Sequence, residues 1–185
     1  MFMNQVKVAG LLMLIGMGQF LLLMQVAQYL YPGYSVSENY ISDLGVGPSA
    51  AIFNGSIIIL GILGMIAVVL LYKSGVDKVF SALLFLASMG AAGVGLFPEN
   101  MGILHTIPSF ITFFFAGISS LYSYRVDEEY SRYIWPILGI ISLLALALFA
   151  SKNYLGLGKG GMERLIVYPV FIWLIGISEY FIQRE

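Results

Sequence analysis

Apolar residues fill this chain in six long stretches that are almost free of charged side chains. After Lys7 the next charged residue is Glu38, and after Asp43 none follows until Lys73. Residues 79–98, 101–124, 133–151 and 165–178 are uncharged as well. A helix of ~20 residues crosses the ~30 Å hydrocarbon layer of a membrane. Because backbone groups in lipid must be paired within the segment, and the runs are too continuous for barrel strands, the stretches predict transmembrane helices.

The predicted fold is all-α, a polytopic membrane helix bundle forming a single transmembrane domain over residues 1–185. A short interfacial helix over about 37–44 is expected after the first span. The first span is expected to be retained, because its apolar run is longer than that of a signal peptide and no A-x-A cleavage site follows. Six Lys and Arg residues fall on the side that holds both termini and three on the other, which favours both termini inside. The six spans are expected at about 8–30, 50–72, 79–97, 103–124, 133–151 and 164–182.

Composition excludes several classes of protein. The chain is 59% hydrophobic and 10% charged, whereas soluble domains carry roughly 25% charged residues. Disordered chains are polar or strongly charged, so disorder is excluded too. The net charge of −1 and the lack of a basic block argue against a nucleic-acid partner. The expected location is the cell membrane, as a multi-pass protein whose surroundings are the lipid bilayer.

Cofactor signatures are few. With no cysteine and one histidine, the chain has no Fe–S cluster, Cys-ligated zinc or bis-His haem. The glycine run from Gly156 to Gly161 follows no strand, so it is not a dinucleotide-binding fingerprint.

Polar residues collect in the three connections that the topology places outside. Ionisable groups at a membrane boundary are costly, and by default they mark a functional site or a paired structural network. If residues 37–44 are helical, the side chains at positions 39, 42 and 43 share one face, and Tyr40 points elsewhere. The gathered residues are Asn39, Ser42, Asp43, Glu99, His105, Glu163, Arg164 and Tyr168.

Acid–base chemistry is one use for this set. His105 would be the general base, oriented by Asp43 or Glu99, and Ser42 would be a nucleophile. These four are therefore the candidate catalytic residues. No G-x-S-x-G elbow supports a hydrolase.

Metal binding and headgroup binding are the other two uses. The oxygen-rich set Asp43, Glu99, His105 and Glu163 suits Mg²⁺, Mn²⁺, Ca²⁺ or Zn²⁺, although no ligand-spacing motif supports a metal. Arg164 with Lys159 would instead grip a phosphate or carboxylate headgroup. The substrate-binding candidates are Asn39, Glu163, Arg164 and Tyr168.

Several motifs resemble the "domain of unknown function 998" family of small archaeal and bacterial membrane proteins with about six predicted spans. The matching stretches are Asn39 to Pro48, Ile52 to Asn54, Leu96 to Glu99 with His105, and Gly161 to Leu165 with Tyr168 and Pro169. The resemblance implies the fold and the location of a site, and it implies no substrate. The positions that match are Asn39, Ser42, Asp43, Glu99, His105, Glu163 and Arg164.

Three functions are compatible with these observations. The leading hypothesis is a membrane-embedded enzyme or binder of a lipid or lipid-linked headgroup. A structural or assembly subunit of a membrane complex is the first alternative. A small-solute transporter is the second, although the deep parts of the spans carry almost no ionisable residues.

Overall fold

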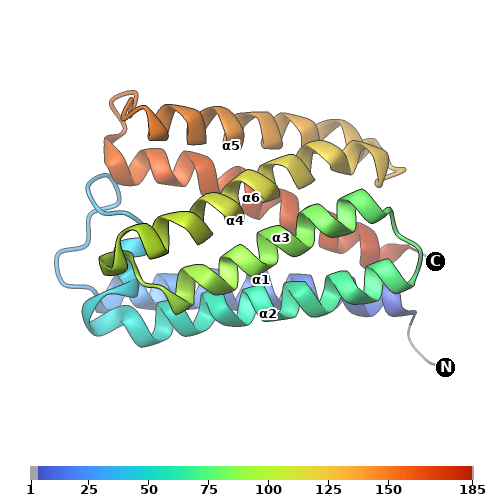
Figure 1. Ribbon diagram of the computed structural model, residues 1–185, viewed down its shortest axis with the longest axis horizontal. Helices are drawn as coiled ribbons and strands as arrows, with labels where there is room; N and C mark the ends of the chain where they lie inside the picture. Colours follow the sequence, from blue (N-terminus) through green and yellow to red (C-terminus); the bar gives the residue numbers. More distant parts are fainter. Residues whose placement is uncertain (1–3, 185) are drawn as a thin grey trace.

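The computed structural model describes residues 4–184, and its regular structure there is entirely helical. With their adjoining 3₁₀ turns, six helices of this part of the chain are long and apolar enough to cross a membrane. The prediction of an all-α chain with six such helices is confirmed. The long helices are α1 (Gln5–Leu30), α2 (Ala50–Lys73), α3 (Lys78–Leu96), α4 (Ile103–Tyr122), α5 (Ile134–Ala150) and α6 (Gly158–Gln183) (Figure 1). The 3₁₀ helices are η1 (Ser42–Gly45), η2 (Gly47–Ser49), η3 (Glu99–Met101), η4 (Ser123–Arg125) and η5 (Tyr130–Tyr133).

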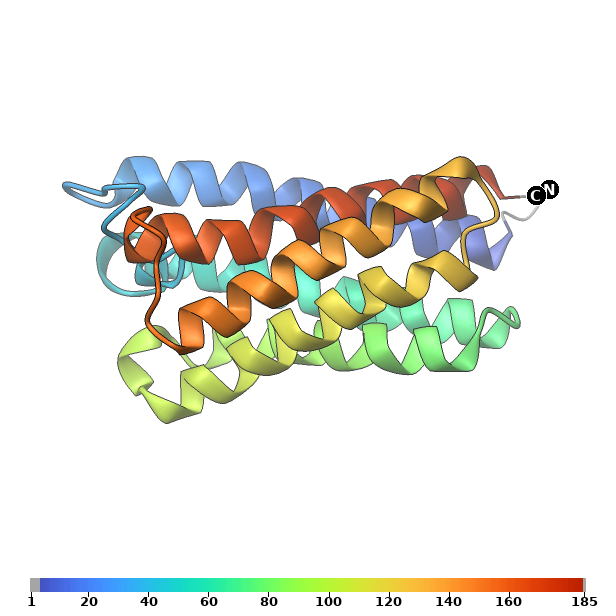
Figure 2. The same ribbon diagram turned by 90° about the horizontal axis from the view of Figure 1, so that it is seen from above.

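The six long helices form a closed ring in chain order. Each helix packs against the next one, and α6 closes the ring against α1. The chain termini lie at one end of the bundle, as Figures 1 and 2 show. The connections 31–49, 97–102 and 151–157 meet at the opposite end, here called the distal end. The topology therefore brings together the three connections that carry the candidate residues.

The two faces of the helices fit a membrane. Methionine and aromatic side chains such as Met17, Phe20 and Trp173 fill the interior of the ring and are almost fully buried. Outward-facing residues such as Leu22 and Leu144 are exposed by 71% and 60%. An apolar surface on every helix is typical of a lipid-facing exterior and unusual for a protein in water.

Helices α4 and α5 touch near the termini and diverge toward the distal end (Figure 1). Near the terminal end Gly139 lies so close to α4 that a Cβ atom there would come within 2.7 Å of the Gly117 carbonyl oxygen. Toward the distal end both helices carry large residues instead, among them Phe110, Phe113 and Phe149. Small residues let helix backbones approach, whereas bulky ones hold them apart. The sequence therefore places a V-shaped opening at the distal end.

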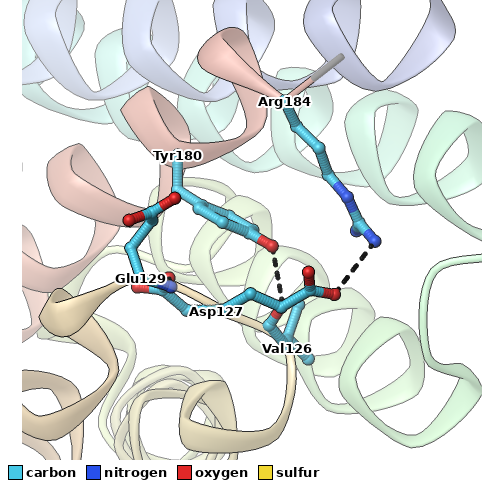
Figure 3. Close-up of polar contacts among 6 residues, drawn as sticks. Val126, Asp127, Glu129, Tyr180 and Arg184 are labelled. Carbon is cyan, nitrogen blue, oxygen red and sulfur yellow. Dashed lines mark hydrogen bonds and ion pairs between the residues drawn. The ribbon is translucent and has the colours of Figure 1, made fainter.

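The terminal end is held by polar contacts around the connection between α4 and α5. The buried Asp127 carboxylate accepts hydrogen bonds from Trp135 Nε1 at 2.6 Å and from the Ser131 hydroxyl at 2.5 Å. Tyr180 donates to the Val126 carbonyl oxygen at 2.9 Å, as drawn in Figure 3. The Arg184 side chain, also visible there, pairs with Glu128 at 3.7 Å. These contacts tie α6 to the α4–α5 connection.

The segment 31–49 differs from the expected helix over 37–44. It forms turns followed by the short 3₁₀ helices η1 and η2. The carbonyl groups of Val36, Ser37 and Asn39 accept hydrogen bonds from α6. These bonds hold the segment against α6 as a series of turns in place of the expected helix. The location of this segment at a membrane interface stays a prediction.

Candidate functional site

Arg164 fastens the segment 31–49 to the first turns of α6. Helix α6 begins at Gly158, before the expected start at 164, so Arg164 lies within the helix and is only 5% exposed. Its Nη1 atom donates to the carbonyl oxygens of Val36 at 2.8 Å, Gly160 at 2.8 Å and Asn39 at 3.3 Å. Its Nη2 atom donates to the Tyr34 hydroxyl at 2.6 Å. The guanidinium group is therefore bound by the protein itself, through three backbone carbonyl oxygens and one side-chain hydroxyl.

Gly160 lets α6 and the segment meet backbone to backbone. Its N–H donates to the Ser37 carbonyl oxygen at 2.8 Å. A Cβ atom at this position would overlap the Asn39 carbonyl oxygen and come within 2.6 Å of that of Val36. Close packing therefore explains the glycine at position 160.

Glu163 orients the start of η1. Its buried carboxylate accepts hydrogen bonds from the backbone N–H groups of Ile41 and Ser42. Carboxylates stabilise the first turn of a helix because they satisfy its free N–H groups. Glu163 thereby places the Ser42 side chain at the distal end of the bundle.

Asp43 and Glu99 form a hydrogen-bonded carboxyl pair that joins two connections. Asp43 also accepts from Asn39 Nδ2 at 2.8 Å and from the Tyr40 N–H at 3.0 Å. Burial opposes the ionisation of Asp43, but the hydrogen bonds from Glu99, Asn39 and Tyr40, with the charge of Lys159, hold its pKa below the ordinary value. Burial and the neighbouring Asp43 raise the pKa of Glu99 to about 8. Near neutral pH the pair therefore holds one proton, on Glu99.

His105 is fixed in one orientation at the start of α4. The chain turns into this helix at Gly102, whose φ of +61° favours glycine. The His105 ring is buried, and its Nδ1 lies 2.7 Å from the Phe97 carbonyl oxygen. A carbonyl oxygen only accepts hydrogen bonds, so Nδ1 carries the proton. In the neutral ring the lone pair is then on Nε2, which is the state that a general base requires.

Glu163, Glu99 and His105 border a cleft of about 450 Å³ between the distal parts of α4, α5 and α6, here called the distal cleft. A smaller cavity of about 60 Å³ continues inward from it and shares Ser42, His105 and Glu163. The walls of the distal cleft are apolar and include Phe110, Phe113, Leu146, Phe149, Ala150 and Ile166. Its polar lining consists of Tyr40, Ser42, Glu99, His105, Thr106, Ser109 and Glu163.

The structure brings four of the eight candidate residues into the lining of this cleft and two more directly behind it. Asn39 and Asp43 lie directly behind the lining, through their bonds to each other and to Glu99. Arg164 is turned toward the segment 31–49. Tyr168 is 41% exposed, packs beside Phe171 and does not line the cleft. The candidates that line it are Ser42, Glu99, His105 and Glu163.

The candidate metal set is not arranged as a cluster. Among residues 4–184, no three His, Asp, Glu or Cys side chains are grouped so that they could hold a metal ion. Asp43 and Glu99 meet, but Glu163 is directed at the backbone of η1. This donor geometry does not fit the predicted metal site.

Tyr40 is a lining residue that the sequence interpretation missed. The expected helix turned it away, whereas the observed turn directs it into the cleft. Burial and a hydrogen bond with Tyr154 raise the pKa of Tyr40 to about 12. The Lys159 ammonium lies 4.7 Å from the centre of its ring. No spacing pattern signals this role, because the turn containing Tyr40 is set by contacts with α6.

Comparison with known proteins supplies the family. The family model described as "Protein of unknown function (DUF998)" matches residues 14–178. The chain belongs to the DUF998 family. The resemblance inferred from the motifs is thereby confirmed, and the match covers all three connections at the distal end of this DUF998 protein. No curated protein and no solved structure gives a significant match.

Proposed function

We propose that this DUF998 protein binds a lipid or lipid-linked amphiphile of the cell membrane, with the headgroup in the distal cleft. The observation that carries the proposal is the mixed lining of the cleft. Its polar side chains, among them His105 and Glu163, come from the connections and from the first turns of α4 and α6, and its apolar side chains, among them Phe110 and Phe149, come mainly from α4 and α5. An amphiphile likewise combines a polar and an apolar part.

The position and size of the cleft support this reading. Its walls belong to helices that are apolar enough to cross a membrane, so a ligand chain could enter from the hydrocarbon layer without passing through water. Its volume of about 450 Å³ falls within the range of roughly 300–1,000 Å³ that is usual for ligand sites. The proposal places the distal end at headgroup depth on the outer face, with the segment 31–49 at the interface.

A matched pair of tryptophan substitutions tests the proposal. Thr106 is exposed and lines the cleft, so Thr106→Trp fills it from the rim. Ile107, on the same helix, is 52% exposed and lies outside the lining, so Ile107→Trp is the control. Native mass spectrometry of protein purified gently from its own membranes should show a bound lipid in the wild type and in I107W, and none in T106W. Equal lipid occupancy in all three proteins would refute the site.

Acid–base catalysis on the bound headgroup is a second candidate function. The geometry that favours it is the orientation of His105 by the Phe97 carbonyl oxygen in the cleft that Glu99 also lines. An imidazole with a free lone pair and a carboxyl group whose pKa is raised to about 8 can serve as base and acid at one ligand. In this reading His105→Gln keeps the ligand bound but changes the lipid composition of cells that express it. Unchanged lipid profiles and turnover in His105→Gln and Asp43→Asn would reduce the function to binding.

A further inference from the structure

We infer that the distal cleft selects an uncharged, hydroxyl-bearing headgroup and disfavours an anionic one. This inference rests on the proposed function, because it names the headgroup class for the same cleft. The observation behind it is the chemical character of the lining. Within the described chain, the residues around the cleft include acids, hydroxyls and one imidazole, and they include neither Lys nor Arg.

Two cations at the distal end, Arg164 and Lys159, do not belong to the lining of the cleft. The Arg164 Nη atoms donate to three carbonyl oxygens and to the Tyr34 hydroxyl, and its Nε is buried. The Lys159 ammonium lies over the face of the Tyr40 ring. A phosphate entering the cleft would therefore lose its water and find no cation among the side chains that line it. Such a loss is strongly unfavourable for an anion.

The charge of Asp43 also disfavours an anion in the cleft. Asp43 is hydrogen-bonded to the lining residue Glu99, and its pKa is held below the ordinary value. A dianionic phosphate beside Glu99 would therefore lie close to the Asp43 carboxylate. An uncharged headgroup meets no such penalty.

Hydroxyl groups match what the polar lining offers. Because the Nδ1–H of His105 is bonded to the Phe97 carbonyl oxygen, the ring in its uncharged form presents an acceptor at Nε2. The Ser42 hydroxyl can accept and donate, and the Thr106 hydroxyl, which donates to the Gly102 carbonyl oxygen at 3.1 Å, remains an acceptor. A headgroup with two or more hydroxyls can therefore donate to acceptors and accept from donors in the same cleft. The geometry points to a glycerol- or sugar-like headgroup on an apolar chain.

Two probes that differ only in a phosphate test this choice. They are 1-monooleoylglycerol and its 3-phosphate, titrated into the full-length protein in an amine-oxide detergent, whose headgroup has no hydroxyl. Native mass spectrometry then gives the bound fraction of each. The wild type and I107W should bind the uncharged probe at least tenfold more tightly than the phosphate. T106W should bind neither.

A lysine at the rim should reverse the preference. Thr106→Lys adds a cation at an exposed lining position, and Ile107→Lys adds the same charge outside the cleft. T106K should bind the phosphate probe at least tenfold more tightly than the wild type does, whereas I107K should leave the ratio of the two probes unchanged.

The outcomes separate the inference from the proposed function. If the phosphate binds the wild type as tightly as the uncharged probe, and T106W removes both, then the site stands and its selectivity is wrong. If neither probe binds the wild type better than T106W, both the site and the headgroup class are overturned.

Discussion

Removing the Arg164 side chain is the most direct test of how the distal end is built. Arg164→Met keeps the bulk of the side chain and deletes its charge and its donors. The segment 31–49 would lose hydrogen bonds at the Val36 and Asn39 carbonyls and at the Tyr34 hydroxyl. Because the bonds to Val36 and Tyr34 are short, at 2.8 and 2.6 Å, they should account for most of the effect.

The expected cost follows from these two bonds. A hydrogen bond to a charged group contributes about 1.5–3 kcal/mol, so the pair contributes roughly 3–6 kcal/mol. Part of this is offset, because the variant no longer buries a guanidinium group that is only 5% exposed. We expect a net loss of about 3 kcal/mol in the free energy of unfolding. Arg164→Lys should fall between the wild type and R164M, since a single ammonium cannot reach both partners in the same geometry.

Two measurements on R164M separate structure from binding. Unfolding by sodium dodecyl sulfate in mixed micelles gives the loss of stability, and hydrogen exchange over residues 31–45 reports whether the segment has come loose. Tyr34→Phe is the control, because it keeps the cation and deletes the bond from Arg164, together with the bond from the Tyr34 hydroxyl to the Tyr40 carbonyl oxygen; its cost should be about 1.5–3 kcal/mol. Unchanged stability and unchanged exchange in R164M would refute the reasoning. Loss of ligand with normal exchange would instead make Arg164 a headgroup-binding residue.

Three further predictions concern other parts of the molecule. Gly160→Ala should destabilise the protein and increase exchange at the segment 31–49, since its Cβ overlaps the Asn39 carbonyl; overpacking of this kind costs about 1–3 kcal/mol. The pKa of Glu99 is raised to about 8, above its ordinary value of 4.5, so its stabilising effect is complete below the ordinary value and is lost as the pH rises through about 8. The unfolding temperature should therefore fall over this interval in the wild type, and Glu99→Gln should flatten the profile. Asp127→Ala should cost about 2–4 kcal/mol in denaturant unfolding, because the Trp135 Nε1–H loses its buried acceptor.

Each of these has a clear contrary result. A Gly160→Ala protein with wild-type stability and exchange would mean that α6 and the segment are not packed backbone to backbone. A pH profile that is the same in the wild type and in E99Q would show that the Glu99 proton does not support the fold. For Asp127, a cost equal to that of Asp127→Asn would show that the charge is unimportant, and a negligible cost in both would remove the contact with Trp135 from the fold.

The family and the location of the candidate site were accessible from local patterns. The alternation of apolar stretches with charged connections places Glu99, His105 and Glu163 in connections or near helix ends. Consecutive helices run antiparallel, so these ends come together at one end of the bundle. The exact course of the segment 31–49 was not accessible, because its carbonyls bond to α6. For the same reason two residues differ from their expected roles. Tyr40 lines the cleft instead of pointing away from it, and Arg164 holds the segment 31–49 instead of facing a ligand.

The sequence by itself determined the helices, their number and the end of the bundle at which polar groups gather. These properties depend on the length and hydrophobicity of single segments. An apolar segment of sufficient length forms a helix in a membrane, because its backbone groups must be paired within the segment. Only the tertiary structure decided that α4 and α5 diverge at their distal ends, that Asp43 and Glu99 come together, and which side chains line the cleft. Such features depend on distances between residues far apart in the chain, and those distances are set by packing around the whole ring.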